Sequence, residues 1–190
     1  MTAPITPSPE SENAARERSR IEEIQAKQTV DENWDPLRPP PIDGLYLKEV
    51  KNVIYQNGVL TEIFRPEWFE DVDGFDVGHI VYVQLLPGRV TQWHRHREQR
   101  DLVFPVRGTI RMGFYDSRED SPTYGKGWVA NFNLHRPRFV YIPQGVWHSL
   151  KNIGGDEAVY IVVNDVPFHY DKPDDWLLPA GSDAIPVSLD

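Results

Sequence analysis

The chain has 190 residues, enough for one domain with a sizeable core, and it carries a net charge of −9. This acidity disfavours nucleic acid as a partner, and the absence of cysteine excludes disulfides and thiolate chemistry. The 17 Pro and 13 Gly argue against a helical bundle. Because no apolar run approaches membrane-spanning length and the N-terminus lacks the apolar core of a signal peptide, we expect a cytoplasmic protein with no membrane partner.

Three regions follow one another along the chain. Residues 1–42 form an N-terminal extension, in which the Pro-rich 1–10 are expected to be disordered and 11–28 to form a helix. Residues 43–170 change to short strands separated by turn residues, which is typical of an all-β barrel or sandwich. Residues 171–190 are an acidic tail, which we expect to pack as irregular structure. The predicted strands are 44–50, 52–56, 59–64, 78–86, 89–96, 101–107, 109–115, 138–142, 147–153 and 158–165.

Histidines and an aspartate suggest a chemical site. Because side chains alternate along a strand, His94 and His96 point to the same side, about 7 Å apart at the backbone. Asp101 in the next strand can join them, and a Pro-x-Gly turn delivers His148 to the start of a later strand. In the alternative, the histidines are exposed strand residues and Asp101 pairs with an arginine, Arg100 or Arg107. The remaining histidines have no partners at such spacing and are assigned to surface or core structure: His79, His135 and His169.

These residues resemble the two motifs of the cupin superfamily. The residues that have the spacing of the first motif, with Asp in the place of its Glu, are Gly88, His94, His96, Asp101 and Gly108. Those that fit the second motif are Pro143, Gly145, His148 and Asn152, while Pro137 replaces its first Gly. The resemblance implies an all-β double-stranded β-helix, a cupin or jelly-roll barrel, over residues 43–170.

Residues 55–170 resemble a narrower family, the dTDP-4-dehydrorhamnose 3,5-epimerases. Residues 57–64 look like that family's Arg-Gly-x-x-x-Glu-x-Phe segment, and 142–148 look like its Pro-x-Gly-x-x-His segment. Residues 116–125 look like its Asp-x-Arg…Ser-Pro-Thr-Tyr-Gly run. This last match is the most specific, because no general requirement of the fold dictates it.

The resemblance implies a homodimeric epimerase, an isomerase that acts on a nucleotide-linked 4-keto-6-deoxy sugar in deoxysugar or polysaccharide biosynthesis, with no cofactor. His94 takes the place of the family's base, which removes the proton next to the C4 ketone, and Tyr160 is the candidate acid on the opposite face. The expected substrate-binding residues are Glu62, His96, Asp101, Arg111 and His148. In the alternative, Glu62 only forms an ion pair with a barrel arginine such as Arg111.

Departures from the family pattern leave two other functions open. Thr91 and Asp101 stand where the family has Arg and Lys, whose charges stabilise the enolate oxygen. The family's Asp that orients the base has its nearest counterpart in residues 187–190. One alternative is a metal-dependent cupin enzyme, a dioxygenase or isomerase, that binds Fe, Mn, Ni or Zn through His94, His96, Asp101 and His148. The other is a cupin that binds a sugar nucleotide without catalysis.

Overall fold

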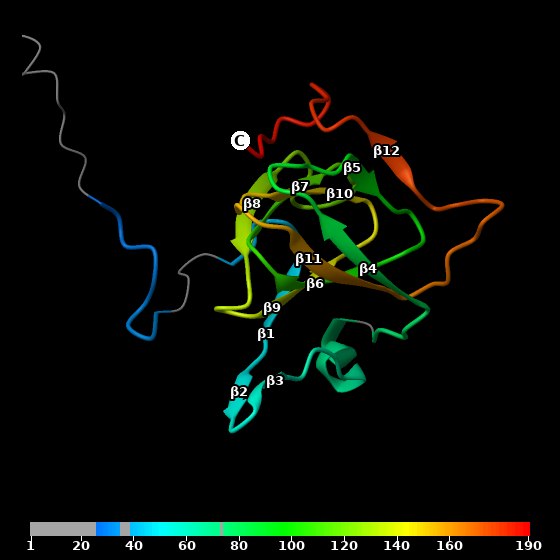
Figure 1. The fold of residues 1–190 in the computed structure, drawn as a ribbon. Helices are drawn as coiled ribbons and strands as arrows, with labels where there is room; N and C mark the ends of the chain where they lie inside the picture. Colours follow the sequence, from blue (N-terminus) through cyan, green and yellow to red (C-terminus); the bar gives the residue numbers. More distant parts are fainter. Residues whose placement is uncertain (1–25, 35–38, 73) are drawn as a thin grey trace, which may run out of the picture. The chain divides into compact units, whose positions relative to one another are not determined.

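Antiparallel strands make up most of the part of the chain that the computed structural model describes, residues 26–34, 39–72 and 74–190 (Figure 1). They lie within a unit that spans Pro40–Asp190. The strands are β1 (Tyr46–Glu49), β2 (Asn52–Tyr55), β3 (Gly58–Thr61), β4 (His79–Leu85), β5 (Trp93–Arg95), β6 (Asp101–Arg107), β7 (Ile110–Asp116), β8 (Gly127–Phe132), β9 (Arg138–Ile142), β10 (Val146–Asn152), β11 (Ala158–Asn164) and β12 (Trp176–Leu178). A 3₁₀ helix, η1 (Pro66–Val72), lies between β3 and β4.

Two five-stranded sheets carry the architecture. One has the order β1-β9-β6-β11-β4 and the other β12-β5-β10-β7-β8, and all pairings are antiparallel. Apart from β7 and β8, neighbours within a sheet are not consecutive in the sequence, as expected for strands that cross between two layers. Strands β2 and β3 form a separate hairpin that extends away from both sheets (Figure 1). The predicted all-β jelly-roll fold is confirmed.

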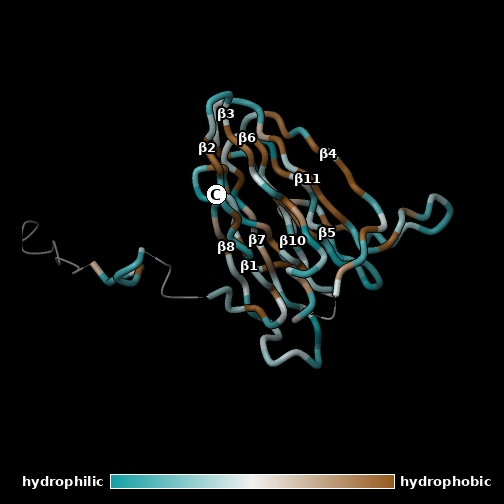
Figure 2. Tube along the Cα trace, turned by 90° about the horizontal axis from the view of Figure 1, so that it is seen from below, coloured by the Kyte–Doolittle hydropathy of each residue, from teal (hydrophilic) through white to brown (hydrophobic). Residues whose placement is uncertain are grey.

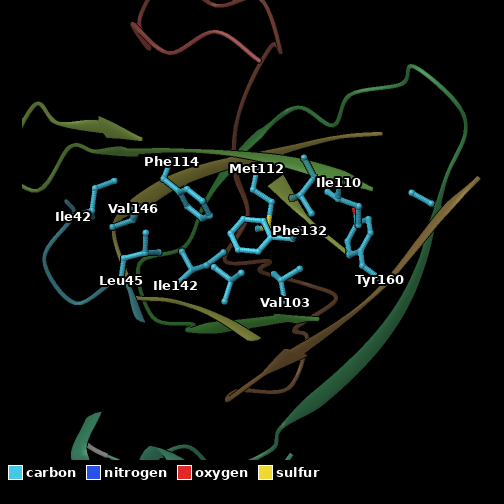
Figure 3. Packing of buried hydrophobic residues seen from close by; sticks show 13 residues of the cluster. Ile42, Leu45, Val103, Ile110, Met112, Phe114, Phe132, Ile142, Val146 and Tyr160 are labelled. Atoms are coloured by element: carbon cyan, nitrogen blue, oxygen red, sulfur yellow. The ribbon is translucent and has the colours of Figure 1, made fainter. Parts of the chain in front are cut away.

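The core lies between the two sheets. Strand β7 is buried at five of seven positions, and Phe114 and Ile110 are almost inaccessible to solvent. Figure 3 shows these side chains meeting Val103 and Ile142 from the opposite sheet. Burial of one such side chain contributes about 1.5–3 kcal/mol to the free energy of folding. The apolar side chains between the two sheets are therefore the main source of stability for the strands. Figure 2 shows apolar residues along the strands and polar residues in the turns.

The structure differs from the predicted strands in three places. The predictions miss β8 and β12, and the strand expected at 89–96 is reduced to Trp93–Arg95. Before that strand, the side-chain oxygen of Thr91 accepts the Leu150 N–H, and its carbonyl accepts the Ser149 hydroxyl. These side-chain bonds replace the regular ladder and shorten β5.

The C-terminal tail is not wholly irregular, because β12 pairs with β5 and extends the second sheet. Beyond β12, the chain passes over β7, where Gly113 leaves room for it: an added Cβ would lie 2.9 Å from side-chain atoms of both Leu189 and Trp93. The expectations for residues 1–10 and most of 11–28 lie outside the described residues, and 26–28 are not helical. Among the residues described, no helix is long and apolar enough to cross a membrane.

Candidate active site

Strand pairing brings the three motif histidines together. His94 in β5 lies directly opposite His148 in β10, and their rings stack with centroids 5.9 Å apart. His96 follows the end of β5 and points to the same side, with its ring centroid 5.5 Å from that of His148. The imidazoles of His94 and His96 therefore lie on one side of the chain, as expected from the alternation of side chains along a strand.

Asp101 joins this cluster at the first position of β6. Its Oδ2 lies 3.3 Å from Nε2 of His96 and 3.3 Å from Nε2 of His148. Its Oδ1 accepts hydrogen bonds from the side-chain amides of Gln99 and Asn164, both at 2.7 Å. The carboxylate is buried, and its partners are histidines and amides. The alternative pairing with Arg100 is not seen, because Arg100 binds Asp165.

The cluster lines a cavity of about 450 Å³. Apolar side chains from both sheets form its walls, among them Val81, Val103 and Leu150. Tyr160 in β11 also lines the cavity, and Figure 3 shows it at the edge of the core. Phe168 and Tyr170, which are more exposed, also line it. A few imidazoles and carboxylates among apolar side chains are typical of a pocket that orients a small organic molecule.

Burial and neighbouring charges set the protonation of the cluster. Burial, together with the neighbouring imidazoles of His148 and His96, lowers the pKa of His94 to about 4, so this imidazole is neutral at neutral pH. Burial also disfavours charge on His96, but the hydrogen bond and charge of Asp101 outweigh it and raise that pKa to about 9. Asp101 is buried, yet its contacts with His148 and His96 hold its pKa well below the usual range.

Tyr160 is suited to hold a proton. It is almost fully buried, and burial raises the pKa of its hydroxyl to about 12. Its strand partners are Val83 in β4 and Pro105 in β6, which hold its backbone between two strands of the first sheet. At neutral pH the cavity therefore contains a neutral imidazole, His94, and a protonated phenol.

Two of the expected substrate-binding residues lie elsewhere in this chain. Glu62 follows β3, is exposed, and pairs with Arg65 at 2.5 Å. Arg111 in β7 donates to the Asn131 side chain and to the Leu189 carbonyl. Neither lines the cavity, and the expected pairing of Glu62 with Arg111 is not formed.

A segment between β11 and β12, which the sequence did not indicate as part of the site, lies against His96. The carbonyl of Asp174 lies 2.7 Å from His96 Nδ1, and its carboxylate accepts the backbone N–H groups of Arg97, Glu98 and Gln99. Its neighbour Asp175 lines the cavity.

Asp190, the residue expected to orient the base, instead pairs with Lys151. His79, assigned to surface or core structure, also lines the cavity. An acidic pair after a proline was the only signal for Asp174 and Asp175.

The most specific sequence match forms a clamp away from this cavity. Asp116, at the end of β7, is fully buried and accepts hydrogen bonds from Arg118 at 2.8 and 2.9 Å. The hydroxyls of Ser121 and Thr123 donate to the same carboxylate, both at 2.6 Å. Arg118 also donates to the carbonyl of Asp43. These hydrogen bonds therefore connect the turn at residues 117–123 and the backbone at Asp43 to β7 of the second sheet.

Comparison with known proteins assigns the chain to a family. The family model described as dTDP-4-dehydrorhamnose 3,5-epimerase matches residues 39–179. The chain belongs to the dTDP-4-dehydrorhamnose 3,5-epimerase family. Members of this family are nucleotide-sugar epimerases, so the chain is an enzyme of the isomerase class, and the cupin-type barrel and the family resemblance are both confirmed.

Individual relatives cover most of the barrel. Agl13 of Haloferax volcanii, a probable low-salt glycan biosynthesis epimerase, is 34% identical over 141 residues, 74% of this chain and 89% of that protein. The spore coat polysaccharide biosynthesis protein SpsL of Bacillus subtilis is 28% identical over 145 residues, 76% of this chain and 93% of that protein. The crystal structure of a dTDP sugar isomerase from Desulfovibrio desulfuricans G20 has a TM-score of 0.71 and 26% identity, covering 78% and 92% of the two chains.

Proposed function

We propose that this protein epimerises a dTDP-linked 4-keto-6-deoxyhexose at one or both carbons next to the ketone, with His94 as the base. The observation that carries this proposal is that His94 and Tyr160 line one cavity in a chain of this family. Three further cavity residues, His96, Asp101 and His148, are proposed to contact the substrate or to hold His94 in place.

The proposed reaction moves protons only. His94 accepts the proton from C3 or C5, and the electron pair of that C–H bond moves into the ring, leaving an enolate with its charge on the C4 oxygen. Tyr160 then donates its hydroxyl proton to the same carbon from the opposite face, which inverts the centre. Both groups recover their protonation state by exchange with water. The balance requires no oxidant and no organic cofactor.

The names of two relatives support a role for this protein in glycan or polysaccharide biosynthesis. Agl13 is named for glycan biosynthesis and SpsL for spore coat polysaccharide biosynthesis. We propose that the product supplies a deoxysugar for a glycan or polysaccharide, and that the protein works in the cytoplasm.

The function is tested by incubating the full chain with dTDP-4-keto-6-deoxyglucose and following the sugar protons by NMR. The expected result is the appearance of the C3 epimer, the C5 epimer or the doubly inverted sugar. The UDP- and GDP-linked 4-keto sugars serve as controls for the nucleotide. Saturable binding of the dTDP sugar with no product would favour the non-catalytic alternative over the epimerase.

Replacing Tyr160 by Phe tests whether Tyr160 donates the proton to the sugar carbon. We expect kcat for epimerisation to fall by about 10²-fold, because the phenyl ring fills the same space but has no proton to donate. KM should change little. Tyr82→Phe, an exposed tyrosine on β4, is the matched control. Steady-state kinetics of the three proteins measure the effect, and an unchanged kcat in Tyr160→Phe would rule out this role.

We also propose that the enzyme is a homodimer in which the β2–β3 hairpin packs on a second copy. The hairpin exposes five large apolar side chains, Val53, Ile54, Tyr55, Val59 and Leu60, and a lone two-stranded hairpin is only marginally stable in water. Glu62 lies just beyond the hairpin and outside its own cavity. A dimer would allow Glu62 to bind substrate in the partner's site.

Charging the tip of the hairpin tests the dimer. Ile54→Lys places a charge at the most exposed of these apolar side chains, 83% accessible, and should shift the protein to a monomer at micromolar concentration. Gln56→Lys, in the hairpin turn, adds the same charge without removing apolar surface. Sedimentation velocity measures both. A dimer that survives Ile54→Lys, or a wild-type monomer, would contradict the proposed interface.

A further inference from the structure

The strand that carries His94 is short and is held from both sides. β5 spans only Trp93–Arg95 and pairs with β10 at one position, where His94 lies opposite His148. On its other side, β12 pairs with all three residues of β5, and Leu177 lies opposite His94. The place of the proposed base therefore depends on where β12 begins.

Two residues before β12, Asp174 binds the turn that follows β5. Its Oδ2 accepts the backbone N–H groups of Arg97, Glu98 and Gln99, with N···O distances of 2.9, 2.7 and 3.0 Å. These three residues lie between β5 and β6 and belong to neither strand. Backbone N–H groups outside a strand need another acceptor, and here one carboxylate serves all three. Asp174 thus takes the place of a neighbouring strand for this turn.

The segment around Asp174 also holds His96. The carbonyl oxygen of Asp174 lies 2.7 Å from Nδ1 of the buried His96 ring. Asp175, which lines the cavity, places its Oδ1 3.5 Å from the same nitrogen. The guanidinium carbon of Arg97 lies 3.7 Å from the centre of the Trp176 ring. Three consecutive residues therefore each contact the segment that carries His96.

We infer that Asp174 is a positioning residue for the proposed epimerisation, because it sets both the place of His96 in the cavity and the start of the strand that holds His94. The inference rests on the proposed function. Asp174 does not line the cavity, so it acts through these histidines and not on the substrate. Without its carboxylate the 97–99 turn loses its acceptor, and a displacement of about 1 Å in an active site can cost about 100-fold in rate.

The test compares three replacements of Asp174 in the full chain, with initial rates on the dTDP-linked 4-keto sugar. Asp174→Ala should lower kcat by about 10–100-fold and change KM less, because the turn and His96 shift while the cavity walls remain. Asp174→Asn keeps an acceptor oxygen at the same reach and should stay within about threefold of the wild-type kcat. Asp174→Glu keeps the charge but is longer by one methylene, and should lose about 10-fold.

The matched control is Asp171→Ala. Asp171 is an exposed carboxylate of the same segment that does not line the cavity, so its loss should leave kcat and KM unchanged. A folded Asp174→Ala variant with wild-type kcat would overturn the inference, even if it unfolds at a lower temperature, since Asp174 would then only stabilise the fold. Equal kcat values for Asp174→Asn and Asp174→Glu would also overturn it. If circular dichroism shows that Asp174→Ala does not fold, this conservative pair decides.

Amide hydrogen exchange, followed by NMR, tests the contact without catalysis. The amides of Arg97, Glu98 and Gln99 should be protected in the wild type, and should exchange at least about 10-fold faster in Asp174→Ala but not in Asp171→Ala. Unprotected amides in the wild type would overturn the inference. Protected amides in a wild-type chain that does not epimerise the sugar would keep the contact and count against the proposed function alone.

Discussion

Replacing His94 by Asn lowers kcat/KM for epimerisation by about 10²–10⁴-fold, the range expected when a general base is removed. Asn keeps a polar side chain of similar reach but cannot accept a proton from carbon. The fall should appear mainly in kcat, because the walls of the cavity and its other polar groups remain. Initial rates with the dTDP-linked 4-keto sugar measure it.

The matched control for His94→Asn is His135→Asn. His135 is exposed and does not line the cavity, so its replacement should leave both kcat and KM unchanged. The thermal unfolding of the two variants should be compared with that of the wild type, because His94 stacks on His148 and its loss also removes packing. A folded His94→Asn variant that retains wild-type kcat would exclude this residue as the base.

Replacing Arg118 by Ala lowers the free energy of unfolding by about 3 kcal/mol. The change leaves the fully buried carboxylate of Asp116 without its cation, and removing one partner of a buried ion pair costs about 3–5 kcal/mol. The expected loss lies at the lower end of this range because Arg118 is partly exposed and because Ser121 and Thr123 still donate to the carboxylate. Urea denaturation of the folded chain measures the loss.

An exposed ion pair provides the control for Arg118→Ala. Arg65 pairs with Glu62, and both side chains are about half exposed and screened by solvent, so Arg65→Ala should leave the midpoint of urea denaturation almost unchanged. The double variant Asp116→Asn/Arg118→Ala should recover part of the loss, because it removes the buried charge itself. Equal losses for Arg118→Ala and Arg65→Ala would mean that the clamp does not stabilise the barrel.

Local patterns predicted the barrel strands and the histidine cluster well. Strand 138–142 has the predicted bounds, because a continuous apolar run between Pro137 and Pro143 leaves little freedom in its ends. His94 and His148 could be expected to lie close together, because each belongs to a motif that fixes both the direction of its strand and the face that its side chain occupies. Asp101 could be placed near them for the same reason.

Contacts between distant segments could not be predicted in this way. Asp174 reaches His96 across 78 residues, and the sequence near it has no periodic pattern to place it. β12 has only three residues and owes its pairing to β5, not to its own composition. The 116–125 motif was assigned to the epimerase resemblance, whereas its carboxylate, hydroxyls and guanidinium bind one another and fasten the fold.

The proposed epimerisation depends most directly on proton transfer at carbon by His94. The decisive measurement is deuterium uptake from D₂O into C3 and C5 of a dTDP-linked 4-keto-6-deoxyhexose, followed by NMR and mass spectrometry. We predict that the wild-type enzyme introduces deuterium at each carbon that it inverts, and that His94→Asn introduces none above the rate without enzyme. Tight binding of the sugar nucleotide with no deuterium uptake by the wild type would contradict epimerisation, and undiminished uptake by His94→Asn would contradict the role of His94 as the base.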